Sequence, residues 1–169
     1  MKRIISLFLA LALFSLSGCG SNKAFPSELT CEDILKAAES AFETPEAETF
    51  YSAAEDNLDA LSLSLWADGV YKECEEWSLL SDYAVFCGAG TSTFEIAVLK
   101  PKSDRDAQKL LDLIERRKET LSLGDKGAYD PDFDYKMKNS VLKTDGGFVI
   151  FLITDNNEAA IEAIEKLKQ

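Results

Sequence analysis

The feature that most constrains the fold is a run of six apolar residues at positions 148–153, which reads Phe-Val-Ile-Phe-Leu-Ile. Because neighbouring side chains of a strand point to opposite faces, a strand that is apolar on both faces is typical of the centre of a sheet. Asp145, Gly146 and Gly147 come directly before this run and follow residues 140–144. Asp-Gly at this spacing favours a tight turn with positive φ, so the two segments predict a β-hairpin.

A second hairpin is predicted earlier in the chain, from residues 82–87 and 94–99 around Gly88 and Gly90. Helical spacing of apolar residues follows each hairpin, over residues 104–121 and 156–167.

Two more helices are predicted at residues 31–43 and 57–66, and Thr30 is placed to cap the first. The chain thus contains a hairpin-plus-helix unit twice. We therefore expect an α+β fold: a four-stranded, mainly antiparallel sheet from two hairpins, with the helices packed on one face.

The N-terminus has the pattern of an export signal. Lys2 and Arg3 precede an apolar run at residues 4–14, which is shorter than the about 20 residues of a transmembrane helix. The next segment, Leu16-Ser17-Gly18-Cys19, resembles the lipobox of bacterial lipoproteins, in which the cysteine carries lipid and the chain is cut just before it. We expect a signal peptide at residues 1–18, lipidated Cys19 with a polar tether at 19–29, and one extracytoplasmic domain at 30–169, held on the cell membrane.

Three cysteines remain, and outside the cytoplasm one disulfide is permitted. Three pairings are possible. Cys87 alternates with Tyr83 and Val85 in a predicted strand, which favours a small buried side chain at that position. A bridge between Cys31 and Cys74 is the favoured pairing, and the alternative is that all three thiols stay reduced.

Charge and missing residue types exclude several function classes. The net charge is −12; without residues 1–18, 16 basic residues face 30 acidic ones, giving −14. This acidity argues against nucleic-acid binding, which needs basic surface. The sequence has no histidine, which excludes Ser-His-Asp and Cys-His catalysis, and no glycine-rich phosphate loop. No cofactor is predicted.

Three alternating aspartates, Asp130, Asp132 and Asp134, have the spacing that opens a calcium-binding EF-hand loop. The following residues depart from that pattern, because Tyr135 stands where glycine is needed and Val141 where the bidentate glutamate should be. A turn begun by Asp130 is the favoured interpretation, and a weak cation site is the alternative.

Glu95 places a charge in an otherwise apolar strand, and Arg117 lies on the flank of the apolar stripe of the following helix. If that helix covers the face that carries Glu95, the two side chains form a partly buried ion pair. A structural ion pair is favoured over a catalytic carboxylate, because no second catalytic group is identifiable near Glu95.

About half of the chain resembles a family of lipoproteins from Gram-positive, gut-type Firmicutes that is described only as a domain of unknown function. The resemblance is a spaced pattern: 94–100 (Phe-Glu-Ile-Ala-Val-Leu-Lys), Asp106-Ala107, Arg117, Tyr129, 139–141 (Asn-Ser-Val) and 147–149 (Gly-Phe-Val). It implies a lipid anchor, the same fold class, and a matched acidic residue and arginine at Glu95 and Arg117. The family usually has tyrosine where this chain has Phe148, and the resemblance implies no activity.

We therefore expect a lipid-anchored cell-envelope protein that binds a partner protein or a small ligand and is not an enzyme. One alternative is an envelope enzyme that uses Asp130, Asp132 or Glu95 with a metal ion. Another is a binder of sugars or peptidoglycan fragments that stacks them on aromatic side chains, with Trp77 and Tyr83 as the candidates.

Overall fold

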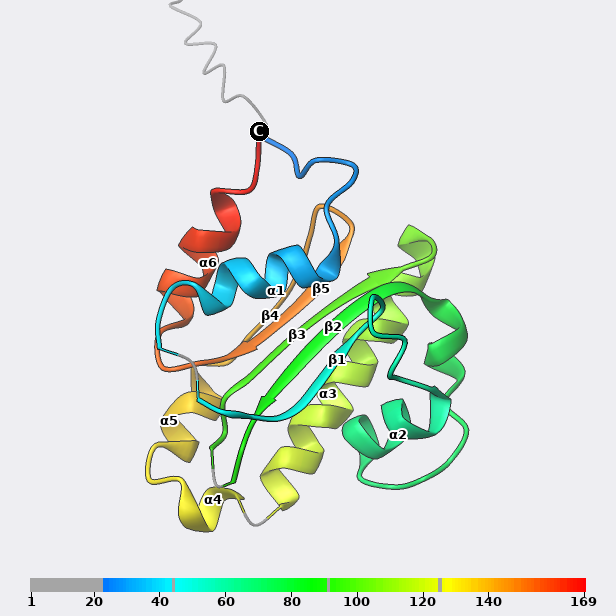
Figure 1. Cartoon of the computed structure of the whole chain (residues 1–169). Helices are drawn as coiled ribbons and strands as arrows, with labels where there is room; N and C mark the ends of the chain where they lie inside the picture. Colours follow the sequence, from blue (N-terminus) through cyan, green and yellow to red (C-terminus); the bar gives the residue numbers. More distant parts are fainter. Residues whose placement is uncertain (1–22, 44, 91, 125) are drawn as a thin grey trace, which may run out of the picture.

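A five-stranded antiparallel sheet with helices on both faces organises the chain (Figure 1). The structure, a computed structural model, describes residues 23–43, 45–90, 92–124 and 126–169. The predicted signal peptide and Cys19 lie outside these residues. The strands are β1 (Ala47–Ser52), β2 (Leu80–Gly88), β3 (Glu95–Pro101), β4 (Val141–Asp145) and β5 (Phe148–Ile153). The helices are α1 (Cys31–Glu39), α2 (Ala60–Asp68), α3 (Ala107–Leu123), α4 (Lys126–Tyr129), α5 (Phe133–Lys138) and α6 (Asn157–Glu165).

The strand order is β1-β2-β3-β5-β4, and each neighbouring pair is antiparallel. Both predicted hairpins form, β2–β3 and β4–β5, and they join through β3 and β5. The prediction of four strands is wrong, because β1 adds a fifth at one edge, with Phe50 opposite Phe86. Residues 47–52 read Ala-Glu-Thr-Phe-Tyr-Ser, a short and half-polar segment that lacks the long apolar run of a central strand.

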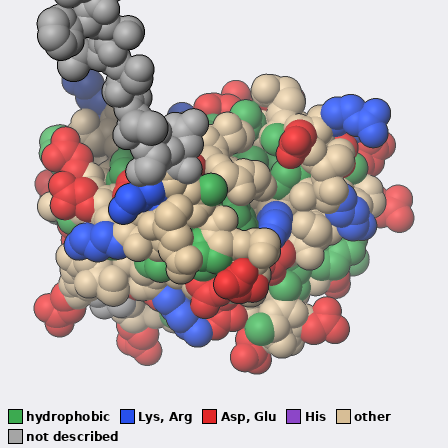
Figure 2. Space-filling model, turned by 90° about the horizontal axis from the view of Figure 1, so that it is seen from above, with side chains coloured by type: hydrophobic (Ala, Val, Ile, Leu, Met, Phe, Trp, Pro, Cys, Tyr) green, Lys and Arg blue, Asp and Glu red, His purple; other side chains and the backbone are tan. Residues whose placement is uncertain are grey.

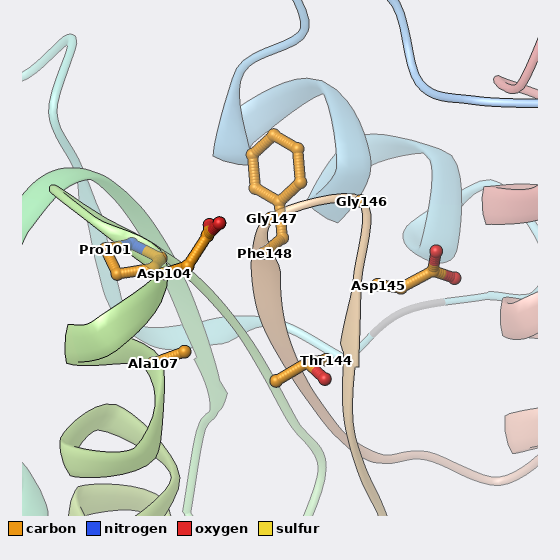
Figure 3. A pocket seen from close by; sticks show the side chains of 8 residues that line it. All are labelled: Pro101, Asp104, Ala107, Thr144, Asp145, Gly146, Gly147 and Phe148. Atoms are coloured by element: carbon orange, nitrogen blue, oxygen red, sulfur yellow. The ribbon is translucent and has the colours of Figure 1, made fainter.

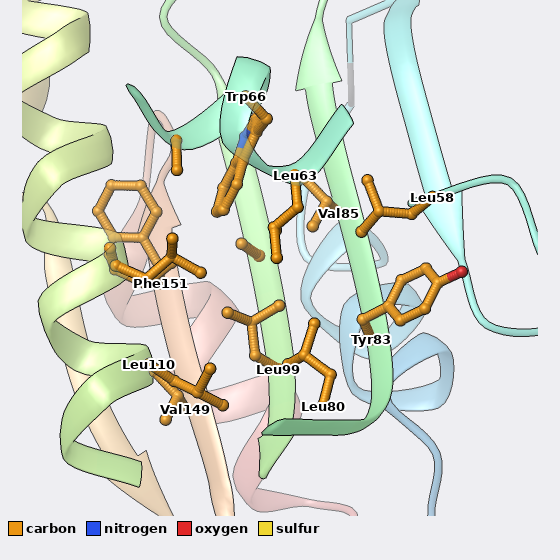
Figure 4. Packing of buried hydrophobic residues seen from close by; sticks show 14 of the residues in the cluster. Leu58, Leu63, Trp66, Leu80, Tyr83, Val85, Leu99, Leu110, Val149 and Phe151 are labelled. Atoms are coloured by element: carbon orange, nitrogen blue, oxygen red, sulfur yellow. The ribbon is translucent and has the colours of Figure 1, made fainter. Parts of the chain in front are cut away.

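The sheet is covered on both faces, so the prediction of helices on one face is also wrong (Figure 1). Ile96, Val98 and Ile150 point toward α1 and α6. Leu99 and Phe151 point the other way, into the core beneath α2 and α3 (Figure 4). Each fully buried side chain of this size stabilises the fold by about 1.5–3 kcal/mol, and β5 supplies such side chains to both cores. The apolar run at 148–153 is thus explained by the two layers that cover it.

Three helices, α1, α2 and α6, begin at side chains that accept hydrogen bonds from backbone N–H groups of their first turns. Thr30 and Asp33 form a reciprocal capping box at α1. The backbone N–H of Cys31 donates to Asp82 of β2 at 2.8 Å, which fixes the start of α1 over the sheet. At α6 the cap is Asn156, whose Oδ1 accepts from the backbone N–H of Ala159 at 3.0 Å.

The N-terminal segment is joined to the other end of the chain. Ala24 and Gln169 exchange two backbone hydrogen bonds, at 3.2 and 3.0 Å. The ring of Phe25 packs edge-on against Phe148 with ring centres 5.8 Å apart, and the Lys168 ammonium lies 4.9 Å from the Phe25 ring centre. Residues 24–29 therefore pack against the domain that is predicted to begin at residue 30.

Candidate functional site

Glu95 and Arg117 form a buried ion pair, as the sequence predicts. Glu95 is 1 % exposed at the start of β3, on the face that α3 covers. Arg117 of α3 donates through both Nη2 and Nε, with Nη2 2.6 Å from Glu95 Oε2 and Nε 3.0 Å from Oε1. The indole N–H of Trp66 donates to Oε1 at 3.0 Å. The carboxylate is thus enclosed by donors, which is the arrangement that makes a buried charge tolerable.

The same arginine holds the end of α2 against α3. Arg117 Nη1 donates to the carbonyl of Trp66 at 2.8 Å, and Thr120 Oγ1 donates to the carbonyl of Ala67 at 2.8 Å. Arg116 Nε reaches the carboxylate of Asp68 at 2.8 Å. The last carbonyls of a helix have no hydrogen-bond donor within the helix, and here side chains of α3 provide the donors for α2. This arrangement docks one helix on another.

Burial alone would lower the pKa of Arg117, but the negative charge of Glu95 and the bonds between them raise it. The arginine is therefore held firmly in its charged form. Because the carboxylate is inaccessible and already fully bonded, it offers no position for a substrate. The pair fits the structural role that the sequence favours rather than a catalytic one.

The structure keeps Cys31, Cys74 and Cys87 as buried thiols, and no disulfide joins any two of them. Cys31 belongs to the core under α1, whereas Cys74 belongs to the core under α2 and α3, on the opposite face of the sheet. The predicted Cys31–Cys74 bridge is therefore not formed, and the reduced alternative describes the structure. Burial raises the pKa of the Cys31 thiol well above its usual value, and burial together with Glu76 raises the pKa of Cys74 to about 11.

Asp130 is buried and holds the β2–β3 loop. Its Oδ2 accepts from the backbone N–H of Thr93 at 3.0 Å and from the Thr93 hydroxyl, and its Oδ1 accepts from the backbone N–H of Asp132 at 3.0 Å. Lys136 Nζ lies 3.3 Å from the same carboxylate. Burial acts to raise the pKa of Asp130, but the Thr93 bonds outweigh it and lower the pKa to about 2.

The other two candidate aspartates do not join Asp130 at a metal site. Asp132 precedes α5 and Asp134 lies in its first turn, and both are exposed. Within residues 23–43, 45–90, 92–124 and 126–169, no three acidic, cysteine or histidine side chains are grouped as metal ligands would be. The predicted turn begun by Asp130 describes the geometry of this segment.

The aromatic residues proposed for sugar stacking are packed into the protein. Tyr83 is 5 % exposed, and its ring centre lies 5.6 Å from that of Trp77 (Tyr83 in Figure 4). The tyrosines that reach solvent most fully among the described residues lie elsewhere: Tyr71, Tyr129 and Tyr135 are 73 %, 67 % and 67 % exposed.

A small cleft of about 260 Å³ lies between the start of α3 and the β4–β5 turn (Figure 3). Ala107 and Thr144 line its sides, and in Figure 3 the Asp145 side chain points away from them. Lys143 and Lys168 neutralise Asp145, each at 2.9 Å. Few polar side chains converge in this cleft, so it lacks the fixed donors and acceptors that orient a ligand.

A larger cleft of about 470 Å³ lies between the end of α5 and the start of α6, and we call it the α5–α6 cleft. The side chains that line it are mostly polar: Tyr135, Asn139, Val141, Thr154, Asp155, Asn156, Asn157, Glu158 and Ile161. Sequence reasoning missed this site, because its residues come from two helices, one strand and the segments next to them, and share no motif. The only local signal was the clustering of Asn156 and Asn157 next to Asp155.

The surface shows no large region of one charge on the face seen in Figure 2, where acidic and basic side chains are interspersed. None of the helices in the described residues has both the length and the apolar character that crossing a membrane requires.

Comparison with known proteins gives one match. A family described as "Domain of unknown function (DUF4358)" matches residues 76–154, the segment from the turn before β2 to the end of β5. This segment includes Glu95, Arg117, Asp130 and four of the five strands. No curated protein and no solved structure matches the chain.

Proposed function

We propose that this protein is a lipid-anchored binding protein of the bacterial cell envelope, attached through Cys19 and exposed outside the cytoplasm. The observation that carries the proposal is the lipobox-like segment at 16–19, which follows two basic residues and a short apolar run. Two or more acyl chains on one cysteine give stable attachment. An acidic domain, with a net charge of −14, therefore needs no basic surface to stay on a membrane.

The docking of Ala24 at Gln169 supports a defined orientation on that membrane. A chain advances at most about 3.6 Å per residue, so Ala24 lies within about 18 Å of the lipid-bearing residue 19. The end of the domain that holds Ala24, Phe25 and the end of α6 then faces the lipid. The α5–α6 cleft, at the start of α6, faces away from it.

We favour binding over catalysis because the two buried acidic side chains, Glu95 and Asp130, are already hydrogen-bonded within the protein. Glu95 is bonded to Arg117 and Trp66, and Asp130 is bonded to Thr93. Each of these contacts joins two structural elements, and neither carboxylate is accessible to a substrate. The metal-assisted enzyme that the sequence left open has no grouped set of ligands in the described residues to support it.

The anchor is tested by expressing the full chain in a bacterium fed an alkyne-bearing fatty acid and detecting labelled protein in the membrane fraction. We expect the wild type to carry the label and Cys19→Ala to lose it. Cys74→Ala, which removes a buried thiol within the domain, serves as the matched control and should keep the label. An unlabelled wild type, or a labelled Cys19→Ala, would refute the proposal.

A further inference from the structure

The α5–α6 cleft has a rigid frame. Asn157 Oδ1 accepts from the backbone N–H of Thr154 at 3.0 Å and from its hydroxyl at 2.7 Å, which fixes the junction between β5 and α6. Asn157 Nδ2 donates to the carbonyl of Asn139 at 2.7 Å, and Asn139 Nδ2 donates to the carbonyl of Tyr135 at 2.8 Å. This chain of bonds ties the end of α5 to the start of α6. The cleft between them is therefore preformed.

Two amide groups at the cleft keep bonding capacity after these bonds are made. Each amide side chain has two donor hydrogens and an accepting oxygen. Asn156 uses its Oδ1 to cap α6, and Asn139 uses its Nδ2 within α5. In the part of the chain that the structure describes, neither Asn156 Nδ2 nor Asn139 Oδ1 forms a hydrogen bond with another protein group. One donor group and one acceptor therefore remain for a ligand.

Acidic acceptors and an aromatic wall complete the site. The Asp155 side chain is 66 % exposed, and its Oδ1 lies 3.1 Å from Lys136 Nζ. Glu158 is exposed in the first turn of α6. Tyr135 lines the cleft and is 67 % exposed, which leaves most of its ring and hydroxyl in contact with solvent.

We infer that the α5–α6 cleft binds an uncharged, hydroxyl-rich sugar unit of an envelope polysaccharide. A pyranose ring presents C–H groups that can lie on a tyrosine ring, and hydroxyls that both donate and accept. Amide and carboxylate groups held in fixed directions match those hydroxyls. Phosphorylated or carboxylated ligands are disfavoured, because the exposed carboxylate of Glu158 repels anions and the domain carries a net charge of −14.

The inference rests on the proposed extracytoplasmic location, where such polysaccharides are found, and it places a sugar site away from Trp77 and Tyr83, the candidates of the alternative in the sequence analysis. It also fits the proposed orientation. α5 lies at the end of the molecule away from the chain end marked C in Figure 1, and Ala24 pairs with Gln169 at that marked end.

The test is calorimetric titration of the full chain, purified in a detergent without a sugar headgroup. Two probes separate the sources of the ligand: a trimer of N-acetylglucosamine, which represents the N-acetylated strand of a cell wall, and cellotriose, which represents a plain hexose polymer. We expect the wild type to bind at least one probe. Tyr135→Ala should weaken that binding by about fivefold or more, because the ring contact is lost.

Tyr129→Ala is the matched control. Tyr129 has the same exposure as Tyr135, lies on the neighbouring α4 and does not line the cleft, so its removal should leave the affinity unchanged. Asn156→Ser keeps a side chain that can cap α6 but removes the amide donor, and should also weaken binding. Circular dichroism of each variant checks that α6 is retained.

A wild type that binds neither trimer at millimolar concentration overturns the inference, and so does equal weakening by Tyr129→Ala and Tyr135→Ala. Binding in detergent solution does not depend on lipid, so Cys19→Ala should bind as the wild type does. The titration tests only the sugar site, so a failure to bind sugar does not affect the evidence for the lipid anchor. The fatty-acid labelling tests only the anchor, so a failure to label does not affect the titration result.

Discussion

Replacing Arg117 with alanine removes the main partner of a carboxylate that is 1 % exposed. Glu95 then keeps the indole N–H of Trp66 as its remaining donor in the described structure. The carbonyl of Trp66 at the end of α2 loses its bond as well. Breaking a buried ion pair by removing one partner costs about 3–5 kcal/mol. Because the Arg117 side chain is 12 % exposed, some water can enter, and we expect the lower part of that range.

The expected loss is measurable as a change in melting temperature. A domain of this size loses roughly 3 °C per kcal/mol, so Arg117→Ala should lower the melting temperature by roughly 10 °C. Urea unfolding, followed by tryptophan fluorescence, gives the free energy of unfolding directly. Adding Glu95→Gln to the same chain removes the stranded charge while keeping an acceptor for Trp66, and should restore at least about 1 kcal/mol.

Arg116→Ala is the matched control, since Arg116 is the next residue on α3 and also forms ion pairs. Its side chain is 36 % exposed, against 12 % for Arg117, although its partners Asp68 and Glu76 are only 9 % and 18 % exposed. Because solvent reaches the Arg116 guanidinium, we expect its removal to cost less free energy of unfolding than the removal of Arg117. If Arg117→Ala destabilised the protein no more than Arg116→Ala does, the assignment of a buried, stabilising ion pair would be wrong.

Three further outcomes are expected. Because the pKa of Asp130 is about 2 in the folded state and near 3.8 when unfolded, its bonds contribute about 2 kcal/mol above pH 5, and this is lost as the pH falls toward 2. Asp130→Asn should therefore flatten the acid side of a stability-against-pH curve measured in urea. Gly146→Ala should destabilise more than Gly147→Ala in thermal melts: both have positive φ, but an added Cβ at Gly146 would lie 2.3 Å from the Phe25 ring, whereas nothing lies within 4 Å at Gly147. The three described thiols should resist iodoacetamide at pH 8 until the protein is unfolded, and a mass shift of the native protein at any of them would contradict their burial.

Much of the fold could be predicted from local patterns, because those patterns have local causes. The Asp-Gly turn placed the β4–β5 hairpin, and helical spacing placed α3 and α6 to within a few residues. β1 escaped prediction because an edge strand has one neighbour and needs no long apolar run. The apolar run at 148–153 shows that both faces of β5 are buried, and burial of both faces requires helices on both sides of the sheet. Which helix packs on which face could not be predicted, because no single segment of the sequence specifies it.

The candidate site also combines features that local sequence patterns predict with features that depend on how distant segments pack. The Glu95–Arg117 pair could be predicted, since a charge in an apolar strand needs a partner and the next helix offered one. The cysteine pairing could not, because it depends on which face of the sheet each residue reaches: Cys31 and Cys74 lie in different cores. The α5–α6 cleft was also hidden, because Tyr135 and Asn156 are brought together by the β4–β5 hairpin that separates them in sequence.

The pairing of Ala24 with Gln169 has a consequence for how the chain folds as it is made. Synthesis proceeds from the N-terminus, so α1 emerges more than a hundred residues before α6, against which it packs. Neither the core under α1 nor the Ala24–Gln169 junction can form until the last described helix is released. We therefore expect little stable structure in chains shortened before residue 157, and a protease should digest such chains as rapidly as unfolded protein.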